Sequence, residues 1–102
     1  MKTRRPARPE IPIGVLERCA AAFRVLAHPH RLRIVELLDD RRLSVGELAE
    51  RLDLPQPATS QHLNLMRSHG LLAAERDGKT VYYKVSNPSA LKILDCIRRH
   101  GT

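Results

Sequence analysis

The segment from residue 43 to residue 70, LSVGELAERLDLPQPATSQHLNLMRSHG, constrains the fold of this chain more than any other part. Ser44 and Glu47 have the spacing of a capping box, in which a hydroxyl and a carboxylate satisfy free amides at a helix start. Pro57 suits the first turn of a second helix, and Gly70 suits its C-terminal end. The segment therefore predicts two short helices joined by a tight turn, a helix-turn-helix.

Apolar spacing and turn signals predict the elements on either side of this unit. Apolar residues recur at intervals of three and four before it, which favours helices, and two short apolar runs flank the turn signal DGK after it, which favours a β-hairpin. The predicted elements are helices over 13–27, 29–38, 45–52 and 57–69, a hairpin over 71–76 and 81–85, and a last helix from Pro88. Residues 39–43 are expected to be a polar break. The expected fold class is mainly α with a β-hairpin wing, that is, a winged helix-turn-helix.

Length and charge limit the remaining possibilities. The 102 residues have room for one domain, and the formal net charge of +7 favours an anionic partner. Residues 1–12 are predicted to be a disordered basic arm and residues 13–102 a single domain. No run approaches the roughly 18 consecutive apolar residues of a membrane span, so we expect a cytosolic protein with no membrane partner. No nucleophile and base, phosphate-binding loop or metal-ligand motif supports an enzyme.

The outward face of the helix over 57–69 has the composition of a surface that meets nucleic acid. No Asp or Glu occurs from Leu54 to Ala74, and a carboxylate there would repel a phosphate backbone. The polar residues on this face follow helical spacing: Ser60, Gln61, Asn64, Arg67 and Ser68. Arg76 and Lys79 at the tip of the hairpin add a basic wing. The alternative is a solvated helix face on a winged-helix module that binds other proteins and senses nothing.

Together these segments resemble the ArsR/SmtB family of bacterial winged helix-turn-helix regulators. The resemblance covers about residues 15–99 and is carried by FRVLAHPHRLRIVELL, SVGELAERLDLPQPATSQHLNLMRSHGLL and RDGKTVYYKV. It implies a homodimer formed by the first and last helices, a palindromic double-stranded DNA operator, and repression that an inducer relieves. Two positions depart from the family pattern, because Asp53 stands where Gly is usual in the turn and Thr59 replaces a Val or Ile.

The resemblance also implies which residues meet DNA. Gln56, Pro57, Ser60 and Gln61 match family positions at the start of the recognition helix, and His62 matches a family histidine that packs on the core. The full set expected at the operator is Gln56, Pro57, Thr59, Ser60, Gln61, Asn64, Arg67, Ser68, Arg76 and Lys79.

The residues that could sense an inducer are fewer. The cysteines of the family's arsenic sensors and the paired ligands of its zinc and nickel sensors are absent, so no cofactor is expected at those sites. Cys19 and Cys96 remain, on the two helices expected to form the dimer. Three readings stay open: buried small apolar residues, thiols that react with an oxidant or reactive sulfur, or a soft transition metal held with His100.

The other histidines are expected to have local structural roles. His28 and His30 flank Pro29 at a helix start, and we expect them to cap that helix or lie at the surface and to share no face with another ligand. His69 is expected beside the C-terminal end of the recognition helix.

Overall fold

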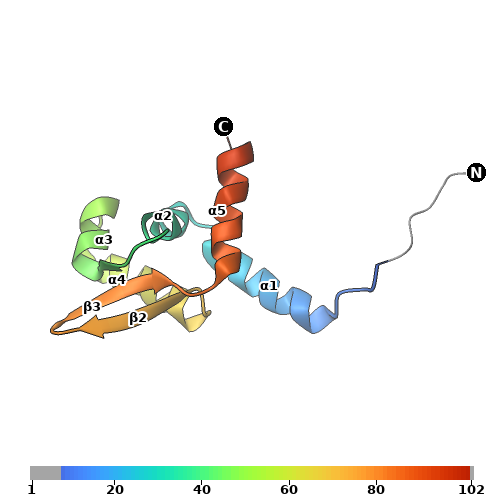
Figure 1. Ribbon diagram of the computed structural model, residues 1–102, viewed down its shortest axis with the longest axis horizontal. Coiled ribbons are helices and arrows are strands. Elements are labelled where there is room, and N and C mark those ends of the chain that lie inside the picture. Colours follow the sequence, from blue (N-terminus) through green and yellow to red (C-terminus); the bar gives the residue numbers. More distant parts are fainter. Residues whose placement is uncertain (1–7, 102) are drawn as a thin grey trace, which may run out of the picture.

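Five helices and a small antiparallel sheet form the part of the chain that the computed structural model describes, residues 8–101 (Figure 1). In chain order they are α1 (Ile13–Leu26), α2 (Pro29–Leu37), β1 (Leu43–Ser44), α3 (Val45–Leu52), α4 (Gln56–Ser68), β2 (Leu72–Asp77), β3 (Thr80–Val85) and α5 (Pro88–His100). The predicted fold class is confirmed, and each predicted boundary agrees to within one residue. None of these helices combines the length and the apolar character needed to cross a membrane.

The predicted basic arm is tested only at its end. Residues 1–7 lie outside the described residues, and residues 8–12 precede α1 without regular secondary structure. Helix α1 begins directly after Pro12, its N-cap, and Val15 N–H donates to the Pro12 carbonyl oxygen at 3.0 Å.

The sheet contains one strand that the sequence did not predict. Residues 39–43 were expected to form only a polar break, but β1 pairs antiparallel with β3, with Leu43 opposite Tyr83, and gives the strand order β1-β3-β2. A two-residue strand is too short to show a periodicity, and its partner lies about 40 residues away in sequence. No local pattern therefore indicates this strand. The hairpin itself turns at Gly78, whose φ of 65° favours a residue without a side chain.

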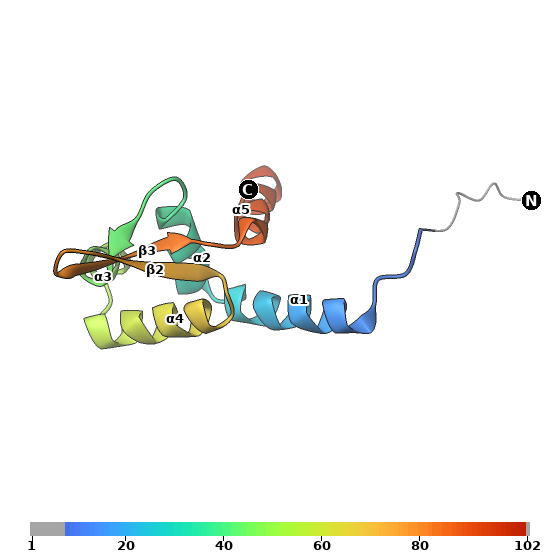
Figure 2. The ribbon, with the colours of Figure 1, turned by 60° about the horizontal axis from the view of Figure 1, so that its bottom comes forward.

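The core fixes which side of α4 faces outward. Leu48, Leu63, Met66 and Leu71 are fully buried, and they come from α3, α4 and the segment just before β2. Figure 2 shows α4 lying against one side of the hairpin, while α1 extends away from it. Because Leu63 and Met66 point into the core, the residues on the opposite side of the helical wheel face solvent.

Helices α1 and α5 carry large apolar side chains that the single chain leaves exposed. The exposed fractions are 71% for Ile13, 46% for Leu16, 54% for Phe23 and 40% for Ile97. Phe23 and Ile97 line one apolar groove between α1, α2 and α5. An apolar stripe on the first helix was predicted, and within the single chain much of that stripe contacts no core.

Candidate nucleic-acid interface

The first helix of the helix-turn-helix begins and ends as the sequence predicts. Ser44 Oγ accepts a hydrogen bond from Glu47 N at 3.2 Å, and Ser44 N donates to Glu47 Oε1 at 2.9 Å, which completes the capping box. Hydrogen bonding of the Glu47 carboxylate to the Ser44 backbone N–H, and secondarily to the Ser44 side chain, lowers the pKa of that carboxyl. Asp53 ends α3 in the left-handed conformation, with φ 56° and ψ 46°. The turn therefore tolerates Asp at the position where the resemblance led us to expect Gly.

Helix α4 presents most of the predicted residues to solvent. Gln61, Asn64, Arg67 and Ser68 are exposed, and Ser60 is half-buried at the edge of the same face. Gln56 and Pro57 are exposed in the first turn. The N-cap of α4, Pro55, has no side chain that accepts a hydrogen bond, so the first-turn amides are left to solvent or to an anion.

Thr59 was wrongly predicted to contact DNA. Its side chain is completely buried, and Oγ1 donates a hydrogen bond to the Pro55 carbonyl oxygen at 3.1 Å. Thr59 lies four residues before Leu63 and seven before Met66, so all three share the inner face of α4. The helical spacing itself was the signal that could have placed it in the core.

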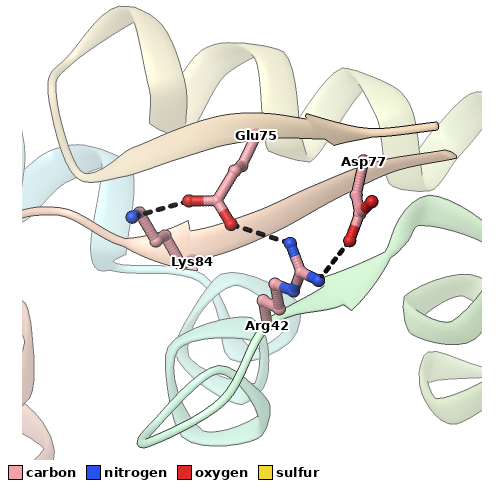
Figure 3. A network of polar contacts seen from close by, with 4 residues as sticks. All are labelled: Arg42, Glu75, Asp77 and Lys84. Carbon is pink, nitrogen blue, oxygen red and sulfur yellow. Dashed lines mark hydrogen bonds and ion pairs between the residues drawn. The ribbon is translucent and has the colours of Figure 1, made fainter.

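The wing carries its predicted basic residues and also an ion-pair network (Figure 3). Arg76 and Lys79 are exposed. Arg42, just before β1, donates from Nη1 to Glu75 Oε1 at 2.8 Å and from Nη2 to Asp77 Oδ2 at 2.7 Å. Lys84 Nζ donates to Glu75 Oε2 at 2.8 Å.

This network compensates the acidic residues of β2. The hydrogen bonds from Lys84 and Arg42 lower the pKa of the Glu75 carboxyl. The Arg42 guanidinium also lies over the Tyr82 ring, 4.3 Å from its centroid. Sequence analysis missed Arg42, because nothing local indicates a partner 33 or 35 residues away.

The two cysteines are both exposed in the single chain, which contradicts their interpretation as buried apolar residues within one protomer. Cys96 lies on α5 in a shallow surface pocket, together with His100, Lys92 and Arg99. Cys19 lies on α1 and does not line that pocket. Within residues 8–101 of one chain, the set Cys19, Cys96 and His100 does not converge as metal ligands.

The histidines at the start of α2 were partly mispredicted. His28 caps α2, because its Nδ1 accepts from His30 N at 3.1 Å, and His69 ends α4 as predicted. The expectation that His28 and His30 share no face with another ligand was wrong. His62 of α4 lies beside both, with its ring centroid 4.8 Å from that of His28 and 5.9 Å from that of His30. A contact between α2 and α4 has no local sequence signal.

Comparison with known proteins agrees with this architecture. Residues 26–75 match a family described as a helix-turn-helix domain. The transcriptional repressor SmtB of Mycobacterium tuberculosis is 35% identical over 97 residues, which are 94% of this chain and 70% of SmtB. The structure of reduced HlyU from Vibrio cholerae superposes with a TM-score of 0.79 at 33% identity, over 85% of this chain and 92% of HlyU.

NolR from Sinorhizobium fredii gives the same TM-score of 0.79, at 34% identity, over 94% of this chain and 99% of NolR. SmtB and NolR thus match nearly the whole described chain, including the wing and the flanking helices. These similarities and the exposed, acid-free α4 beside a basic wing lead to one assignment. This chain belongs to the ArsR/SmtB family of winged helix-turn-helix transcriptional regulators, which are DNA-binding proteins and not enzymes.

Proposed function

We propose that this protein is a repressor that binds a palindromic operator as a homodimer, with one α4 in each of two successive major grooves. The observation that carries the proposal is the exposed face of α4. It offers amide, hydroxyl and guanidinium groups, and no carboxylate occurs from residue 54 to residue 74. Amide and guanidinium groups read base edges in the major groove, and positive charge binds phosphates.

The proposed dimer buries the apolar faces of α1 and α5. Phe23 and Ile97, which line one groove, are exposed in the single chain. Contiguous exposed apolar surface of this kind marks an interaction site in a soluble protein. A two-fold dimer through these helices sets the separation of the two α4 helices, which must be about 34–36 Å to read successive major grooves.

The proposed inducer acts on Cys19 and Cys96. Both thiols are exposed, and both lie on the helices that form the proposed dimer. Two thiols that give up two electrons and two protons to one hydrogen peroxide form a disulfide and two waters. Such a bond changes how α1 and α5 pack and so changes the separation of the α4 helices. The similar HlyU structure is of a reduced protein.

DNA binding tests the repressor proposal directly. Fluorescence anisotropy compares a duplex from the promoter of the protein's own gene with a random duplex, at several salt concentrations. We expect binding to the promoter to be at least about 10³-fold tighter and to weaken steeply with salt. Equal affinity for both duplexes contradicts a sequence-specific repressor.

Peroxide treatment tests the inducer proposal. We expect peroxide to release the wild-type protein from the promoter duplex and to leave Cys96→Ser bound, with dithiothreitol reversing the release. Equal release of both proteins removes Cys96 from the mechanism. The rival proposal, a soft metal held by Cys19, Cys96 and His100, predicts instead that a metal salt causes release and that His100→Ala prevents it.

A further inference from the structure

Three imidazole rings from two helices meet on the side of α4 that faces α2. His28 and His30 come from the start of α2, and His62 comes from the middle of α4. Each ring contributes one nitrogen to a set of three, and these three nitrogens all lie within 4.8 Å of one another. All three residues are half-buried, so the cluster is held by the fold and is still reachable from solvent.

Two of the rings already hold hydrogen bonds that fix their protonation. His28 Nδ1 accepts from the backbone N–H of His30 at 3.1 Å, and His62 Nδ1 accepts from Arg31 Nε at 3.1 Å. A ring that accepts at Nδ1 is not doubly protonated, because both nitrogens of an imidazolium are donors. The His28 and His62 rings are therefore in the neutral form that metal ions bind.

The surroundings of His62 favour the neutral form as well. Burial lowers the pKa of His62, and coulombic interactions with His28, Arg31 and His30 lower it further, because positive charges close together repel one another. Three imidazoles without a carboxylate or thiolate are a nitrogen-only set of ligands. Such a set suits zinc, nickel, cobalt or copper rather than magnesium or calcium.

We propose that His28, His30 and His62 form a binding site for one divalent metal ion of the zinc type, which bridges the start of α2 to α4. Zinc–nitrogen bonds of about 2.0–2.1 Å place two ligand nitrogens no more than about 4.2 Å apart. The rings therefore move slightly closer together when the ion binds. Water completes the coordination.

The ion competes with the hydrogen bonds at Nδ1. A neutral imidazole has one nitrogen lone pair, and in His28 and His62 that lone pair now accepts from the His30 N–H and from Arg31. Metal binding displaces both donors, either at Nδ1 itself or through a shift of the ring proton from Nε2 to Nδ1. Arg31 then keeps its hydrogen bond from Nη1 to the Val25 carbonyl oxygen, at 3.1 Å. The site thus exchanges a hydrogen-bonded link between α2 and α4 for a metal-bridged one.

The test uses the full chain with Cys19→Ser and Cys96→Ser, so that no thiol can bind the metal. Co²⁺ is titrated into the metal-free protein while its visible d–d absorption is recorded, and Zn²⁺ is then added to displace it. Two variants remove one ring each and spare the fold: His30→Ala, whose backbone N–H stays, and His28→Asn, whose amide oxygen can still cap α2. His69→Ala, at the exposed end of α4, is the matched control.

We expect one Co²⁺ per chain, bound through nitrogen, and affinities lower by at least about tenfold in His30→Ala and His28→Asn, because even the loss of an outer-shell partner costs that much. His69→Ala should bind as the parent does. Zn²⁺ should raise the thermal midpoint of the parent and of His69→Ala but not of His30→Ala. Unchanged affinity in His30→Ala, or an equal loss in His69→Ala, overturns the proposal. The titration contains no DNA, so its failure would leave the proposed function as a DNA-binding repressor unaffected.

Discussion

Arg42 donates a hydrogen bond from Nη2 to Asp77 Oδ2 across 2.7 Å, although the two residues are 35 positions apart in sequence. The contact joins the last residue of β2, at the tip of the wing, to the residue that precedes β1. Nη1 of the same guanidinium holds Glu75. One side chain thus orients the wing and compensates both of its carboxylates.

Arg42→Gln tests this double role. We expect little change in the free energy of unfolding, because both ion pairs are exposed. We expect a several-fold loss of affinity for DNA, because Glu75 and Asp77 then repel the backbone. Arg33→Gln breaks the exposed ion pair with Glu36 inside α2 and is the control. Equal DNA affinities of the two variants, measured by anisotropy, contradict a role for Arg42 at the wing.

Substitution of Arg67 should weaken DNA binding, whereas substitution of Thr59 should not. Arg67→Ala should lower DNA affinity and reduce the slope of log K against log salt by about 0.9, if the guanidinium neutralises one phosphate. Thr59→Val keeps the buried shape and should leave affinity and slope unchanged. Its stability should change by no more than about 1 kcal/mol, because the Pro55 carbonyl oxygen still accepts from the backbone N–H of residue 59. A changed salt slope in Thr59→Val would place that side chain at the DNA after all.

The capping box should make stability depend on pH. The folded protein lowers the pKa of Glu47 below its ordinary value of 4.5. The ionised carboxylate therefore contributes stability that is fully present above about pH 4.5 and is lost as the pH falls through the lowered pKa. Glu47→Gln can still accept from Ser44 N–H but does not titrate.

Urea unfolding of wild type and Glu47→Gln, at equal protein concentration, measures this contribution. We expect wild type to be the more stable at neutral pH and the difference to shrink below about pH 4.5. Because Glu75 has a lowered pKa in both proteins, its effect cancels in the comparison. A stability difference that does not vary with pH would show that the charge on Glu47 plays no part.

Phe23 should be essential for the proposed dimer. Its side chain is 54% exposed in the single chain, and a charge at that position would be buried without a partner in an interface through α1. We expect Phe23→Glu to sediment as a monomer and to lose about 10²-fold or more in operator affinity, because the two reading helices are no longer linked. Arg24→Glu, the exposed neighbour on α1, should stay dimeric. A dimeric Phe23→Glu would move the interface elsewhere.

The sequence predicted what depends on neighbours along the chain. Helical spacing, the capping box at Ser44 and the turn at Gly78 are local, and each appears in the structure as expected. The burial of Thr59 was also predictable from its helical spacing, although Thr59 was placed among the residues expected to contact DNA. The ion pairs of Arg42 and the approach of His62 to the start of α2 depend on tertiary packing between distant segments, so no local pattern indicates them.

Ser44 is both the last residue of β1 and the N-cap of α3. The central strand of the sheet, β3, pairs with β1, and β1 runs directly into α3, the first helix of the helix-turn-helix. No linker separates the wing from the helix-turn-helix at this point. We therefore expect β1 and α3 to move together. Because the wing and the helix-turn-helix are joined without a linker, we expect a signal that changes DNA binding to move the helix-turn-helix and wing of one protomer together, relative to those of the other protomer.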